Sequence, residues 1–163
     1  MMTDQRTQAI EQILQSLVGQ WQGIARTWFG PETLADESPI RGSVRRIGTS
    51  RFVIHEYESA FEATPLHGAG IYGYNQLTDS FEGAWVDSFH MPTNIMASAG
   101  NPAELTLSVL GSYEVEGSSD WGWRTEIVAD GPDRLLITAY NLQPDEPETK
   151  AVEIIYSRVE AAA

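Results

Sequence analysis

The carboxylate of Asp87 lies in a run of alternating aromatic residues, an unusual setting for a charge. Within segment 80–89, Phe81, Trp85, Asp87 and Phe89 occupy alternate positions, and alternate residues of a strand share one face. We expect this aromatic face to point into the fold and to take Asp87 with it. A buried carboxylate needs a partner. Asp87 therefore either pairs with an arginine, or caps backbone amides near a rim, or binds a ligand or substrate.

A second set of ionisable residues lies in segment 51–61, which also has the pattern of a strand. His55 and Glu56 are neighbours and must point to opposite faces, and the sequence leaves open which of them points inward. An inward Glu56 joins Asp87 as a pair of carboxylates suited to general acid–base chemistry. An inward His55 acts as a base or orients a ligand. In this enzymatic alternative, His55 or Tyr74 assists Glu56 or Asp87 in proton transfer.

Arg124 is the candidate counter-charge for these carboxylates. It either forms a surface pair with Glu126 or a neighbour, or lies buried against Glu56 or Asp87. A buried guanidinium can also hold a ligand carboxylate through two hydrogen bonds.

The chain is rich in aromatic residues, with five Trp, six Tyr and five Phe. Small-molecule sites are commonly walled by aromatic side chains with a few polar groups, although aromatic residues also dominate ordinary cores. The predicted ligand-binding residues are Trp21, Tyr72, Tyr74, Trp85, Asp87, Trp123, Arg124 and Tyr140.

The three histidines, His55, His67 and His90, match no short metal-ligand motif. They can meet only if strands bring them together, and we predict no metal site. The chain has no cysteine, which excludes disulfides, Cys-bound zinc and iron–sulfur clusters.

The elements that must position these residues are one helix and many strands. A stripe of apolar residues at helical spacing predicts an N-terminal helix over about 4–18, which Gly19 ends. No second helical stripe follows. About ten strands with turn signals between them are predicted near 20–29, 39–47, 51–61, 67–75, 80–89, 94–98, 104–113, 121–129, 134–142 and 149–159. Residues 30–38 are predicted to be a long polar loop at a barrel mouth.

This pattern predicts an all-β fold of one domain over 1–163, an antiparallel barrel spanning about 19–159. Five segments along the chain carry a further signal: Leu17–Gly23, with its Gly-x-Trp step, Arg51–Glu58, Gly70–Asn75, Trp85–Ser88 and Glu153–Arg158. Taken in this order, they resemble a bacterial calycin-like (lipocalin-like) family known only as a domain of unknown function. The resemblance implies a fold and no activity.

A more distant resemblance links the Gly-x-Trp step at Gly19 and Trp21 to nitrobindin-type and fatty-acid-binding barrels. The resemblance to nitrobindin-type barrels implies haem bound through a histidine late in the chain. The last histidine here is His90, and residues 121–159 contain none, so we predict no cofactor and disfavour haem. Trp21 is also expected to seat the helix and close the barrel.

Charge excludes several partners. The chain carries 10 Lys and Arg against 23 Asp and Glu, a net charge of −13, which argues against nucleic acid and anionic membranes. No signal segment or bilayer-spanning apolar run is visible, so we predict a cytoplasmic protein. The favoured function is binding of a small, largely apolar molecule. The alternatives are the acid–base enzyme, a haem or metal binder, and a filled barrel that acts through its surface or as a homodimer.

Overall fold

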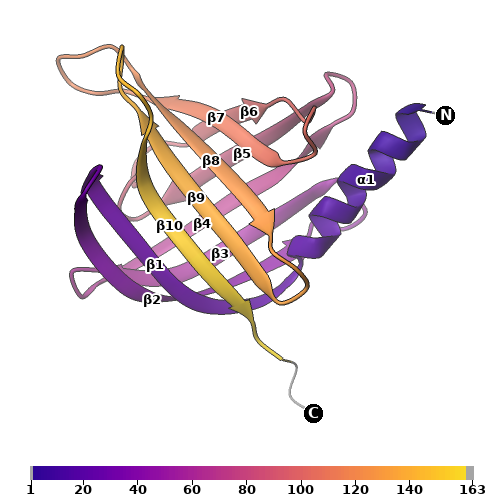
Figure 1. Ribbon diagram of the computed structural model, residues 1–163, viewed down its shortest axis with the longest axis horizontal. Helices are drawn as coiled ribbons and strands as arrows, with labels where there is room; N and C mark the ends of the chain where they lie inside the picture. The colour runs from indigo at the N-terminus through magenta and orange to yellow at the C-terminus, as the bar shows by residue number, and fades with distance from the viewer. Residues whose placement is uncertain (1, 161–163) are drawn as a thin grey trace.

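The computed structural model describes residues 2–160 and contains one helix and ten strands (Figure 1). The elements are α1 (Met2–Leu17), β1 (Gly19–Gly30), β2 (Thr33–Arg46), β3 (Phe52–Phe61), β4 (Thr64–Asn75), β5 (Ser80–Asp87), β6 (Met96–Gly100), β7 (Leu107–Tyr113), β8 (Trp121–Ala129), β9 (Arg134–Leu142) and β10 (Thr149–Arg158). The predicted helix and strand number are confirmed.

The strands form a closed antiparallel barrel in which each strand pairs with its neighbours in sequence. Closure comes from β1, which pairs with β2 on one side and with β10 on the other. A closed barrel has no edge strand, so every strand keeps its backbone hydrogen bonds on both sides. The predicted all-β barrel fold is therefore confirmed.

Helix α1 lies across one end of the barrel (Figure 1). Its apolar stripe is buried there, with Ile10 and Leu14 fully inaccessible and Leu17 nearly so. Trp21 at the start of β1 is also buried, and its Nε1 donates to the Leu17 carbonyl at 2.9 Å. Trp21 thus fixes the helix to the barrel, as its position predicted.

Within residues 2–160, no helix is long and apolar enough to cross a membrane.

The other end of the barrel is the mouth, formed by the turns at 31–32 and 62–63 and the longer segments 88–95, 114–120 and 143–148. The predicted polar loop at 30–38 is wrong, because β1 and β2 continue almost to a two-residue turn. Polar residues of this hairpin are satisfied across the strands, for example Arg26 and Glu37, whose Nε and Oε2 atoms lie 2.6 Å apart. The prediction failed because the residues at this end of the hairpin are polar and exposed, and such a strand has the same composition as a loop.

The buried helix face predicts that the helix is required for stability. Leu14→Ala removes a fully buried side chain and should lower the free energy of unfolding by about 2–5 kcal/mol. Gln15→Ala, on the exposed side of the same turn, should change it by about 0.5 kcal/mol or less. Urea unfolding of the two variants measures the difference. Equal stabilities would show that α1 does not pack against the end of the barrel.

Candidate functional site

An internal cavity lies between the packed helix end and the mouth. Its inner chamber has a volume of about 70 Å³ and extends down to His55 and Tyr72. An outer chamber of about 170 Å³ opens at the mouth beside Met91 and Tyr113. The residues that border both chambers are Thr27, Trp85, His90 and Trp123. The two chambers therefore adjoin, and three of the four residues between them are aromatic.

Asp87 ends β5 and borders the inner chamber, and its carboxylate is buried and hydrogen-bonded. Its Oδ1 accepts the backbone amides of Phe89 at 3.0 Å, of Met91 at 3.1 Å, and of His90. Its Oδ2 lies 3.1 Å from the Tyr57 hydroxyl, which donates to it, and 3.1 Å from His90 Nδ1. Asp87 therefore shapes the turn after β5 and holds two side chains at the cavity wall.

These contacts also decide the charge of Asp87. Burial raises the pKa of its carboxyl group. The hydrogen bond and charge of His90 and the backbone amides of Met91 and His90 lower this pKa, and together they outweigh the effect of burial. On balance the pKa lies below its ordinary value, so the group is a carboxylate at neutral pH. The expected inward position and the backbone capping are both present, whereas no arginine pairs with Asp87 among residues 2–160.

Gly68 makes room for the contact between Tyr57 and Asp87. On β4 it pairs with Tyr57 of β3 on one side and with Asp87 of β5 on the other. A Cβ atom at Gly68 would collide with the Tyr57 ring and with the Cβ of Asp87. Because the position has no side chain, the Tyr57 ring passes over it and its hydroxyl reaches the carboxylate.

Trp85 and Trp123 form the aromatic wall. Their rings stack with centroids 5.4 Å apart and planes inclined by 16°. Trp85 Nε1 donates to the Tyr57 hydroxyl at 2.9 Å, which fixes the indole orientation through Tyr57 to Asp87. The His90 ring packs against both indoles, at 5.6 Å from Trp85 and 5.3 Å from Trp123.

Three phenylalanines continue this wall onto the rim. Phe61 stacks on Phe89 with centroids 4.4 Å apart and lies 5.6 Å from Phe29. Phe29 is 67% exposed and Phe89 is 39% exposed. Phe89 was expected to continue the inward face of β5, but the strand ends at Asp87 and the turn carries Phe89 to the rim. Apolar surface thus extends from solvent to the outer chamber.

His55 lies deeper in the barrel and is buried. Its Nε2 shares a 3.0 Å hydrogen bond with the Tyr156 hydroxyl. Gly42 provides the space, because a Cβ atom there would collide with both groups. Burial lowers the pKa of His55 to about 4, so the imidazole is neutral near pH 7. His55 is thus the hydrogen-bond partner of Tyr156, and its side chain borders the inner chamber.

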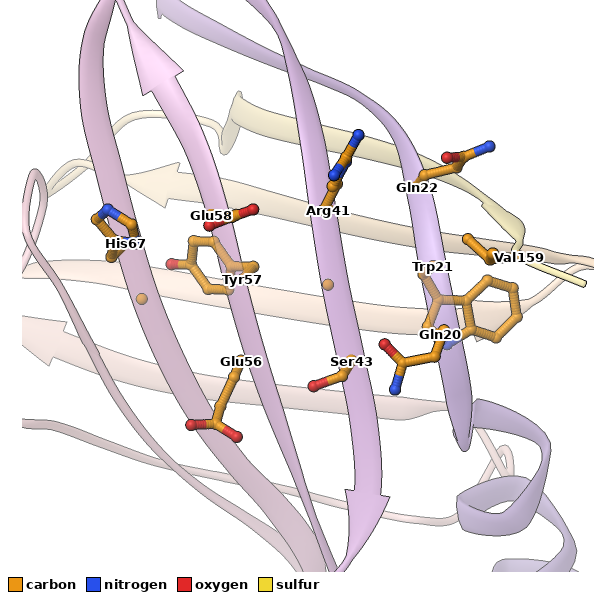
Figure 2. A pocket seen from close by; sticks show the side chains of 12 residues that line it. Gln20, Trp21, Gln22, Arg41, Ser43, Glu56, Tyr57, Glu58, His67 and Val159 are labelled. Carbon is orange, nitrogen blue, oxygen red and sulfur yellow. The ribbon is translucent and has the colours of Figure 1, made fainter. Parts of the chain in front are cut away.

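Glu56 points away from the cavity. The regular register of β3 places Val53, His55 and Tyr57 inward and Glu56 outward, where its side chain is 54% exposed. Figure 2 shows Glu56 beside Ser43 in an open hollow over β1–β4, whose lining also includes His67, near Glu58. The predicted pairing of Glu56 with Asp87 is therefore not formed, because neighbouring residues of a strand face opposite sides.

Arg124 and Tyr140 also lie outside the barrel. Arg124 forms ion pairs with Glu126 at 3.1 Å and Glu148 at 2.8 Å, and its guanidinium covers the Tyr140 ring at 4.3 Å. These contacts correspond to the surface alternative for Arg124. Neither residue borders the two chambers.

The remaining predicted ligand-binding residues divide between the two ends of the barrel. Tyr72, Trp85 and Trp123 border the cavity. Trp21 and Tyr74 lie in the core near α1, where Trp21 contacts Leu17 and the Tyr74 hydroxyl donates to Asp79 at 2.7 Å. The structure therefore brings together three of these aromatic residues with Asp87.

Sequence reasoning missed two residues of the site, Tyr57 and His90. Both contact Asp87. The signal for His90 was local: an Asp at the end of a strand commonly accepts amides two to four residues on, which places the third residue beside the carboxylate. The signal for Tyr57 was that it alternates with His55 and so shares its face of β3. Its contact with Asp87 could not be predicted, because this contact depends on the register of β3, β4 and β5.

The three histidines do not converge. His55 and His90 border the cavity, whereas His67 lines the outer hollow. Over the described part of the chain, no group of three His, Asp or Glu side chains is arranged to hold a metal ion.

The buried His55 predicts a loss of stability in a defined pH window. Its ordinary pKa is 6.5 and its folded value about 4, so between these values the unfolded chain binds a proton that the folded protein does not. As the pH is lowered from 6.5 to about 4, the free energy of unfolding should therefore fall by about 1.4 kcal/mol per pH unit, about 3 kcal/mol in all. Below this window the loss should level off.

Urea unfolding at a series of pH values tests this. His55→Gln, which retains a polar group for Tyr156, should lose this part of the slope. His67→Gln on the outer face should retain it. Parallel stability curves for the wild type and His55→Gln would contradict the assignment.

The barrel resembles a solved structure. The crystal structure titled Rv2717c from M. tuberculosis matches with a TM-score of 0.59 at 13% sequence identity, over 90% of this chain and 95% of that chain. At this identity the likeness concerns the fold alone. No curated protein sequence matches the chain.

The sequence profile described as "Protein of unknown function (DUF1579)" matches residues 6–158. This range includes part of α1, all ten strands and the cavity. The match confirms the predicted resemblance to a family of unknown function, and the chain belongs to the DUF1579 family.

Proposed function

We propose that the protein binds a small, planar, largely apolar molecule in the cavity at the mouth of the barrel. The observation that carries this proposal is the contrast between the two ends. The helix end is filled by side chains such as Leu14, Trp21 and Phe81, whereas the mouth end keeps two adjoining chambers walled by Trp85 and Trp123.

The size of the cavity limits the ligand. Each chamber is smaller than the roughly 300 Å³ at which pockets for drug-sized ligands begin, with volumes of about 70 and 170 Å³. A fatty acid chain therefore does not fit without rearrangement. An apolar cavity of about 150 Å³ is large enough for benzene. The proposed ligand is accordingly a molecule of about one aromatic ring, bound in the outer chamber.

The wall suits a planar ring. Trp85 and Trp123 are already stacked on each other, and Trp85 is fixed by its bond to Tyr57. Aromatic pairs contribute about 0.5–1.5 kcal/mol beyond the burial of area. Side chains that are ordered before binding also lose little conformational entropy when the ligand enters.

Calorimetric titration with benzene, phenol and indole tests the proposal. At least one probe should bind one-to-one with a Kd below about 1 mM. Ala151→Phe should weaken this binding at least tenfold, because Ala151 borders the outer chamber, the one large enough for a ring, and is buried. Ala97→Phe places the same ring on an exposed position and should leave binding unchanged.

Overpacking can destabilise a barrel, so thermal unfolding of both variants accompanies the titrations. Thr27→Leu, a smaller substitution at a residue that borders the outer chamber, provides a second test. Absence of binding by all three probes, or equal binding by the wild type and both filled variants, would contradict a ligand site in the cavity.

A further inference from the structure

We propose that His90 is the proton-accepting anchor of this cavity and that the ligand is an aromatic molecule with a weakly acidic hydroxyl group, a phenol. This inference rests on the proposed function and narrows its ligand class. It is carried by the geometry of the Asp87–His90 contact and by the position of the His90 ring.

The first step is the orientation of the imidazole. His90 Nδ1 lies 3.1 Å from Asp87 Oδ2, and a carboxylate can only accept at this contact. Nδ1 therefore carries the proton, and the lone pair of a neutral ring is at Nε2. A carboxylate that fixes the tautomer in this way also stabilises the imidazolium that forms when Nε2 takes up a proton.

The second step is the availability of Nε2. Within residues 2–160, this atom has no hydrogen-bond partner, and the side chain is 21% exposed. The ring borders both chambers and packs against Trp85 and Trp123. Nε2 is thus the ring nitrogen that a molecule stacked on the indoles can reach.

The third step compares His90 with the other ionisable side chains around the cavity. The Tyr57 hydroxyl of β3 donates to Asp87 and accepts from Trp85. The Tyr113 hydroxyl of β7 donates to Asn141 at 2.6 Å. Deeper in the cavity, His55 is paired with Tyr156, and burial raises the pKa of Tyr72. Among these groups, His90 is the one positioned to accept a proton from a ligand.

The proton transfer balances without any further reactant. The O–H bond of the phenol breaks, and its proton forms a new N–H bond at His90 Nε2. The electron pair stays on the oxygen, which becomes a phenolate. The resulting imidazolium lies between this phenolate and the carboxylate of Asp87, so the added positive charge has a negative neighbour on each side.

The test uses 4-nitrophenol and nitrobenzene, which differ by one hydroxyl group. The ionised form of 4-nitrophenol is yellow, so its absorption reports the proton directly. At a pH below its solution pKa, the wild type should bind 4-nitrophenol at least tenfold more tightly than nitrobenzene and should increase the yellow fraction. His90→Gln should lose both effects and still bind nitrobenzene. His67→Gln, the same change on the outer face, should behave as the wild type does.

The outcomes separate this inference from the proposed function. If nitrobenzene and 4-nitrophenol bind equally well, or if His90→Gln keeps the yellow form, the anchor is overturned while the cavity remains a ligand site. If neither probe binds the wild type, both proposals fail. Thermal unfolding of His90→Gln confirms that a lost preference does not reflect a lost fold.

Discussion

A buried carboxylate at the end of β5 is the constraint on which the mouth of this barrel depends. An isolated carboxylate removed from water costs several kcal/mol or takes up a proton. Asp87 avoids both through three backbone amides, the Tyr57 hydroxyl and the His90 ring. The same contacts that satisfy the charge also fix the turn after β5 and, through Tyr57, the indole of Trp85.

The two ends of the barrel interior are packed differently. Helix α1 fills one end with buried aliphatic side chains. The other end carries aromatic rings and an unfilled space. Gly42 and Gly68 allow His55 and Tyr57 to lean across neighbouring strands. Polar side chains therefore point into the barrel without the strands separating.

The fold was largely predictable from the sequence, since one helical stripe and ten alternating segments allow few architectures. The site was predictable only in part. Alternation placed Asp87 and Trp85 inward, but it could not choose between His55 and Glu56, because that choice depends on the strand register. The partners of Asp87 come from a turn and from a strand 30 residues earlier, and pairings of this kind are not encoded in local periodicity.

The most direct test of the central claim is the protonation state of His90, measured by long-range ¹H–¹⁵N correlation NMR of the ligand-free protein near neutral pH. If Asp87 holds the ring as described, His90 carries a proton on Nδ1 in its neutral form, and Nε2 has the chemical shift of an unprotonated nitrogen. Asp87→Asn should abolish this preference. A neutral His90 that carries its proton on Nε2 would contradict the account.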